Sequence, residues 1–215
     1  AYNATFQVPD THDAQFIAVS PDGAHRPAKV EAVAPSGLLS MSNAADYIII
    51  THPNFLEPSR RLANWRSTER GGGFRTKVVD VTKIYDAFGD GRVNPKAIKD
   101  FLAYAYENWQ SPALSYVVIM GDGTYDFLGV DKELYPEPPE VMGYIPTHYI
   151  WTTSFGRTAA DHWYATVSGL DELTDFYIGR LTVETIDHAT GIVDKIINYE
   201  SNRPNGSWRR HIISV

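Results

Sequence analysis

Two short runs of almost wholly apolar residues constrain the fold of this chain more than any other feature. Residues 46–51 read Asp-Tyr-Ile-Ile-Ile-Thr, and residues 116–120 read Tyr-Val-Val-Ile-Met. Strands without apolar–polar alternation are typical of parallel sheets whose two faces are both covered. Residues 76–81 predict a further strand between these two in the sequence. From Ala44 onward the pattern therefore predicts a doubly wound, mainly parallel α/β fold.

Helical segments alternate with these strands. Residues 55–70 carry apolar residues among charges, and the three glycines at 71–73 stop the helix. Asn94-Pro95 begins a second helix, whose apolar residues recur every three or four positions. A short strand at 176–178 and a third helix over 185–200 follow. This alternation predicts helices that flank the sheet.

Residues 1–44 have a different pattern. Short alternating runs are interrupted by Pro-Asp, Pro-Asp-Gly and Pro-Ser-Gly turns, which predicts β-hairpins. A few short strands rarely form an independent core, so this segment is expected to be the end of a preceding β-domain. Residues 45–215 are then the α/β unit. Its last predicted strand, 211–215, coincides with the end of the sequence, which predicts a truncated domain, because ligand sites lie in loops beyond such strands.

The composition excludes several classes of protein. The net charge is −7 without a basic stripe, so nucleic acid is not an expected partner. The 215 residues contain no cysteine, which rules out a disulfide framework, a thiolate metal site and a thiol nucleophile within them. No apolar run approaches the ~20 residues of a membrane span. The first residues lack the pattern of a signal peptide, which is expected to be removed or to lie outside this sequence.

The first candidate site is the segment 121–127, Gly-Asp-Gly-Thr-Tyr-Asp-Phe, directly after the strand at 116–120. Chemistry in α/β proteins gathers at this end of the strands. Asp122 and Asp126 in an oxygen-rich loop suit Ca²⁺, whereas a glycine-rich turn capped by aspartate is the structural alternative. A metal-dependent phosphohydrolase using these two carboxylates would need a nucleophilic carboxylate where Met120 stands. No phosphate-binding glycine motif of the nucleotide-binding type is present.

A second group of acidic residues follows the Pro- and Gly-rich stretch 121–160, which predicts a functional loop. Its members are Asp161, Asp171, Glu172 and Asp175. Asp161 and Asp175 could converge with Asp122 on one cation. His162 has no second histidine at metal-ligand spacing, so the expected role is that of a hydrogen-bonded structural histidine. No Ser or Thr lies in a nucleophile elbow.

Five segments share one order and spacing: residues 45–52, 116–126, 161–164 (Asp-His-Trp-Tyr), 178–181 (Ile-Gly-Arg-Leu) and 193–200. Together they resemble the gingipain family of cysteine peptidases, peptidase family C25. The resemblance implies a caspase-like fold with a parallel sheet, in secreted or surface-attached endopeptidases that use a Cys-His dyad. Neither member of the dyad lies in this sequence. The chain therefore resembles the amino-terminal subdomain, and the missing catalytic subdomain would bind the polypeptide substrate.

The resemblance also implies a structural calcium site. Its ligands match the carboxylates of Asp122, Asp161 and Asp175, and main-chain carbonyls near Thr158 and Trp163. The stretch between Trp163 and Asp175 is longer here than in the best-known members, which leaves Asp171 as a rival ligand.

Two hypotheses of function follow. In the first, the chain is the scaffold subdomain of a secreted gingipain-like cysteine endopeptidase and is inactive alone. In the second, the protein is a non-catalytic surface or assembly module that keeps the fold without the dyad. In either case, a sheet without its second half has an exposed edge or an uncovered apolar face, which would favour self-association.

Overall fold

The computed structural model describes residues 19, 23, 32–131, 133, 143–169, 171–202, 206, 211 and 212. Its contacts divide the chain into two units, Ala1–Ala34 and Pro35–Val215, and the account below concerns the second. The β-hairpins predicted for residues 1–44 lie mainly outside the described residues, and residues 32–44 contain no strand. Of the strand predicted at 211–215, only His211 and Ile212 are described, and neither lies in a helix or strand.

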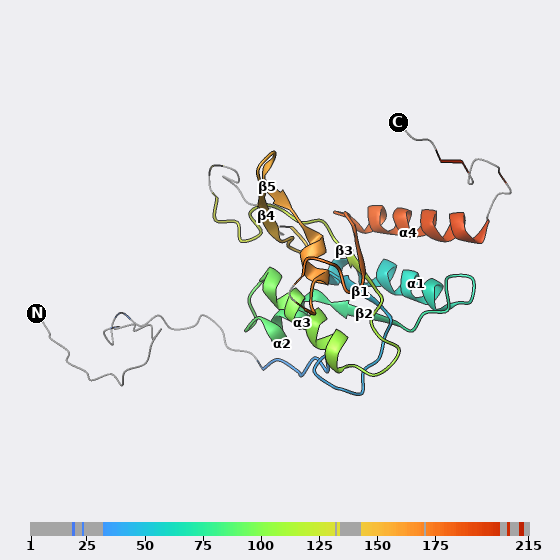
Figure 1. Cartoon of the computed structure of the whole chain (residues 1–215), viewed down its shortest axis with the longest axis horizontal. Helices are drawn as coiled ribbons and strands as arrows, with labels where there is room; N and C mark the ends of the chain where they lie inside the picture. Colours follow the sequence, from blue (N-terminus) through green and yellow to red (C-terminus); the bar gives the residue numbers. More distant parts are fainter. Residues whose placement is uncertain are drawn as a thin grey trace, which may run out of the picture. The chain divides into compact units, whose positions relative to one another are not determined.

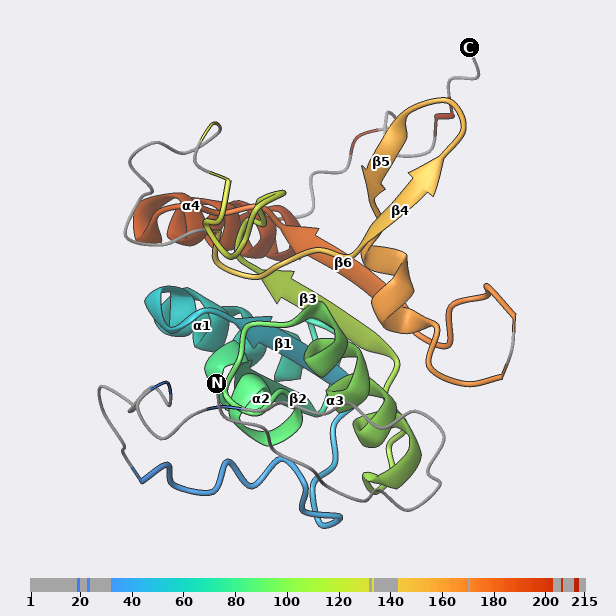
Figure 2. The same ribbon diagram turned by 90° about the vertical axis from the view of Figure 1, so that its left-hand side faces the viewer.

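The second unit is built on a four-stranded parallel sheet. The strands lie in the order β2 (Thr76–Asp80), β1 (Tyr47–Thr51), β3 (Tyr116–Met120) and β6 (Tyr177–Leu181) (Figure 2). From β1 the chain moves first to one side of the sheet, to β2, and then to the other, to β3 and β6. A reversal of this kind defines a doubly wound sheet, which confirms the predicted fold class.

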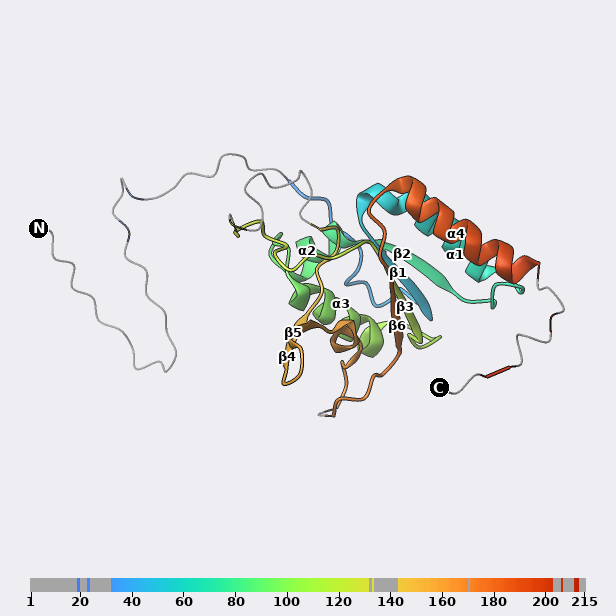
Figure 3. The same ribbon diagram turned by 90° about the horizontal axis from the view of Figure 1, so that it is seen from above.

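Helices cover both faces of this sheet. The helices are α1 (Leu56–Ser67), α2 (Val81–Phe88), α3 (Pro95–Asn108) and α4 (Ile186–Ser201). α1 and α4 pack together on one face, and α2 and α3 pack together on the other (Figure 3). Two 3-10 turns, η2 (Pro53–Phe55) and η3 (Asp161–Ala165), complete the connections.

Side-chain caps begin three of these helices, and the capping residues are Asp80, Asn94 and Thr185. Each accepts a hydrogen bond from a main-chain N–H that the first helical turn leaves unpaired. The sequence analysis did not predict α2, because Val81 extends the apolar run of the second strand. In the structure Asp80 ends β2 and at the same time caps α2.

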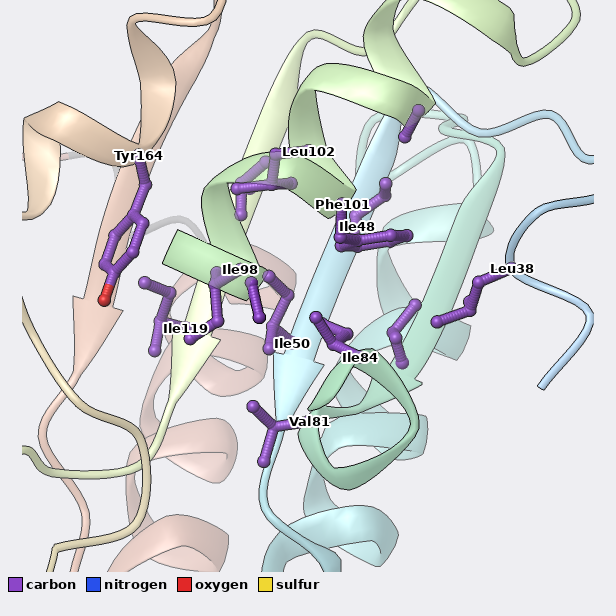
Figure 4. Close-up of a cluster of buried hydrophobic side chains, with 14 of the residues drawn as sticks. Leu38, Ile48, Ile50, Val81, Ile84, Ile98, Phe101, Leu102, Ile119 and Tyr164 are labelled. Atoms are coloured by element: carbon purple, nitrogen blue, oxygen red, sulfur yellow. The ribbon is translucent and has the colours of Figure 1, made fainter. Parts of the chain in front are cut away.

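β1 is buried on both faces, as its composition predicts. Ile48 and Ile50 belong to the core cluster beneath α2 and α3, together with Phe101 (Figure 4). Ile49 belongs to the cluster beneath α1 and α4. Because successive side chains of a strand point to opposite faces, three consecutive isoleucines supply both cores at once.

The long segment after β3 contains a hairpin that the sequence analysis did not predict. β4 (Tyr149–Thr152) and β5 (Gly156–Ala159) pair antiparallel, apart from the main sheet (Figure 1). The prolines that suggested an irregular loop all precede β4 in the sequence. Trp151 and Phe155 of this hairpin are 80% and 85% exposed.

Candidate functional site

The carboxyl end of β3 joins three parts of the fold. The main-chain N–H of Gly121 donates to the carbonyl of Leu181 (3.0 Å), and that of Asp122 donates to the carbonyl of Val183 (3.0 Å). The carbonyl of Asp122 accepts from the N–H of Tyr144 (2.8 Å). The Gly-Asp-Gly motif is therefore a main-chain junction between β3, the end of β6 and the loop that carries Tyr144.

Gly121 is required for this junction. Its φ of +147° belongs to a region that side-chain-bearing residues rarely adopt. A Cβ atom at Gly121 would also lie 2.9 Å from the Cβ of Tyr144. The first glycine of the motif is thus explained by backbone conformation and by the close approach of a loop.

Arg180 on β6 forms an ion pair with Asp161 of η3. Its Nε lies 2.7 Å from Oδ2 and its Nη2 lies 2.9 Å from Oδ1. The hydroxyl of Thr147 donates to the same Oδ1 at 2.6 Å. Burial raises the pKa of Asp161, but the hydrogen bonds and charge of Arg180 and the Thr147 hydroxyl outweigh it and hold the pKa below its ordinary value. Both oxygens of this carboxylate therefore have partners.

Asp175 caps the turn after η3. Its Oδ2 accepts hydrogen bonds from the main-chain N–H groups of Val167 (2.7 Å) and Ser168 (2.9 Å). The rival ligand Asp171 accepts from the N–H of Leu173 at 3.0 Å. Both aspartates thus make the local side-chain-to-backbone bonds that are typical of turns.

The other two predicted ligands lie on the hairpin and on η3. Thr158 is part of β5. The indole of Trp163 stacks on the ring of His148, with centroids 3.9 Å apart, and the Nζ of Lys99 lies 4.3 Å from its centroid. The carbonyl of Trp163 accepts a hydrogen bond from the hydroxyl of Thr166 (3.0 Å).

The described residues do not assemble the predicted calcium ligands. Within them, no three His, Cys, Asp or Glu side chains form a group that could hold a metal ion. Asp161 is occupied by Arg180 and Thr147, and Asp175 binds its own turn. This arrangement does not fit a site built on three free carboxylates, and calcium binding stays a prediction.

The sequence analysis assigned no role to Arg180. The segment Ile-Gly-Arg-Leu served only as evidence of family resemblance. A charged side chain inside a strand of a covered sheet must find partners, because burying an unpaired charge is costly. That signal was present in the sequence and points to the residue that organises the site.

The phosphohydrolase alternative lacks its nucleophile. Met120 is fully buried, and its sulfur accepts a hydrogen bond from the hydroxyl of Ser59 (3.1 Å). Asp126 accepts from the N–H of Asp131 at 2.6 Å, and this bond holds the pKa of Asp126 below its ordinary value. Asp126 therefore closes a local loop, and no carboxylate takes the position of Met120.

A cavity of about 390 Å³ opens at the carboxyl ends of β1 and β2. Its lining includes His52, Tyr85, Phe127 and Tyr144. The ring of His52 lies edge-on to that of Tyr144, with centroids 5.1 Å apart. Burial lowers the pKa of His52, although the charge of Asp80 opposes the shift. The cavity lies where α/β sheets place ligands, and it combines aromatic walls with a neutral histidine.

Lowering the pH from about 7.5 to about 5.5 is expected to lower the melting temperature, partly through His148. Burial, and then the charges of Lys99 and His162, lower the pKa of His148 in the folded chain. Below the ordinary histidine pKa of about 6.5, the unfolded chain therefore binds more protons than the folded chain, and stability is lost. Melting curves of the wild type and of His148→Gln across this range test the prediction. The variant should lose less, and an equal loss would contradict it.

Comparisons with known proteins place this fold in a family. A model of peptidase family C25 matches residues 40–215. The structure of dimeric latent PorU from Porphyromonas gingivalis is similar at a TM-score of 0.63 and 22% identity, over 80% of this chain and 17% of that one. The complex of RgpB pro- and mature domains, from the same organism, is similar at 0.51 and 23%, over 71% and 28%. No curated protein gives a significant match.

The two solved structures show the shared fold, and the chain spans less than a third of the length of either. The family model covers well over half of the chain, including every strand of the parallel sheet. It also covers the Gly-Asp-Gly junction and the Arg180–Asp161 pair. The chain therefore belongs to peptidase family C25.

Proposed function

We propose that this chain is the scaffold part of a gingipain-like cysteine endopeptidase. The observation that carries the proposal is the match of the family model over residues 40–215. The parallel sheet supports it, because the loops anchored at its carboxyl end can form a rigid rim beside a neighbouring catalytic unit. The chain contains no cysteine, so the nucleophile of the Cys-His dyad would be supplied by residues outside this sequence.

The same proposal gives polypeptides as substrates and a secreted or cell-surface location. Within the described parts of the chain, no helix combines the length and the hydropathy needed to cross a bilayer. Self-association through an uncovered face stays part of the proposal. It is supported by β6, which is an edge strand of the described sheet and carries Tyr177 at 72% exposure.

The test uses the natural protein that contains this chain, with labelled unfolded casein as the substrate. We expect cleavage that iodoacetamide lowers by at least about 100-fold, since covalent catalysis needs a free thiolate. The 215-residue chain alone should give no cleavage, because it has no thiol to react. Cleavage that survives complete alkylation would overturn the cysteine-peptidase assignment.

A second candidate, a non-catalytic surface or assembly module, is favoured by the absence of cysteine from the whole sequence. The same assay separates the two. A natural protein that is folded by its melting curve, yet cleaves neither casein nor a set of basic and apolar peptide substrates, would support the module. Cleavage that is sensitive to thiol reagents would exclude it.

A further inference from the structure

All five N–H groups of the Arg180 guanidinium donate hydrogen bonds. Two go to the carboxylate of Asp161, at 2.7 and 2.9 Å. The other three go to main-chain carbonyls, those of Gly121 (2.9 Å), Ile145 (2.8 Å) and Pro146 (3.2 Å). The side chain of Arg180 is only 9% exposed. This cation is therefore buried with its hydrogen-bonding capacity fully used.

The acceptors come from segments that are distant in the sequence. Gly121 follows β3, Ile145 and Pro146 belong to the loop before the hairpin, and Asp161 begins η3. Arg180 itself lies on β6. One side chain thus connects the sheet to both ends of the segment that carries the hairpin.

The chemistry of this acceptor set is that of a cation site. A carboxylate together with several main-chain carbonyls is the kind of oxygen shell that Ca²⁺ takes in proteins. Here the positive charge at its centre is a guanidinium, whose planar donors suit bidentate contact with a carboxylate. The metal and the arginine would do the same work, which is to neutralise Asp161 and hold the loops together.

We propose that Arg180 is a built-in cation that takes the place of a structural metal at this sheet edge. A divalent ion at Asp161 would have to displace Arg180 or lie beside its buried positive charge, and either arrangement is unfavourable. The loop anchoring of this chain is then independent of calcium. The inference concerns the chain's own stability and stands or falls separately from the proposed peptidase activity.

The first experiment measures melting temperatures of the 215-residue chain in millimolar CaCl₂ and in EGTA. We expect the wild type to melt at the same temperature in both. Arg180→Gln should melt about 10 °C lower, because Asp161 and three carbonyls lose their partner, and Arg180→Lys should fall in between. Arg61→Gln is the matched control, since its ion pair with Asp194 is 43% and 40% exposed and should matter little.

A second readout separates local anchoring from general stability. Limited chymotrypsin digestion under native conditions, with fragments identified by mass spectrometry, should cut Arg180→Gln first between residues 143 and 160. Cutting there should be at least about 10-fold faster than in the wild type, because local opening governs such cleavage. The Arg61→Gln control should keep the wild-type rate.

Two results would overturn the proposal. One is a wild-type melting temperature that rises by several degrees in calcium and falls in EGTA, which would show that a metal does the work. The other is an Arg180→Gln protein that matches Arg61→Gln in both assays. Should Arg180→Gln fail to fold, the calcium response of the wild type and the digestion of Arg180→Lys decide the matter.

Discussion

Replacing Phe101 by alanine is expected to lower the free energy of unfolding by about 3–5 kcal/mol. Phe101 lies on α3 and is fully buried against the sheet. Its ring meets those of Phe88 and Trp109 edge-to-face, with centroids 5.7 Å apart in each pair. The truncation removes apolar contacts and leaves a cavity that a close-packed core fills only in part. Urea unfolding followed by circular dichroism measures the loss.

Phe155→Ala is the matched control for this prediction. Phe155 has the same side chain but is 85% exposed on the hairpin. Its replacement should change the free energy of unfolding by no more than about 0.5 kcal/mol. If the two variants lie within about 1 kcal/mol of each other, α3 does not pack on the sheet as described.

Replacing Glu200 by alanine is expected to cost about 2–3 kcal/mol. The Glu200 carboxylate at the end of α4 accepts bonds from both terminal nitrogens of Arg66, each at 2.9 Å, and from the indole N–H of Trp65 at 2.5 Å. The side chains of the ion pair are 19% and 24% exposed. Without Glu200, a partly buried guanidinium and indole lose their acceptor, and α1 loses a polar link to α4. Chemical denaturation gives the magnitude.

The comparison for Glu200 is Asp100→Ala. Asp100 pairs with Lys96 one turn away on α3, and these side chains are 40% and 68% exposed. An exposed helical pair of this kind contributes about 0.3–0.5 kcal/mol, since water screens it and two mobile side chains must be ordered. Equal costs at Glu200 and Asp100 would show that the Arg66 network is screened by solvent like an ordinary surface pair.

Much of the fold could be predicted from local patterns. The strands at 46–51 and 116–120 were expected from uninterrupted apolar runs, and α3 from Asn94-Pro95 and its periodic apolar face. The elements that were missed had misleading local signals. α2 was hidden because Val81 continues a strand-like run, and the hairpin was hidden because prolines precede it.

The candidate site was less predictable than the fold. The segments that mattered were recognised, since the Gly-Asp-Gly motif, Asp161 and Asp175 all lie at the carboxyl end of the sheet or in the turns leading to β6. Their roles depend on partners that local patterns do not reveal. Asp175 is engaged by its own turn, and Asp161 is engaged by an arginine that was noted only as part of a family motif.

By itself, the sequence determined that β1 is buried on both faces, because three consecutive isoleucines leave neither face polar. It also determined where helices begin, because a cap and the first turn are neighbours in the chain. Only the tertiary structure decided that Arg180 supplies the positive charge to Asp161. That choice depends on β6 lying beside β3 and on loops closing over their ends, so the interacting groups meet only after the chain has folded.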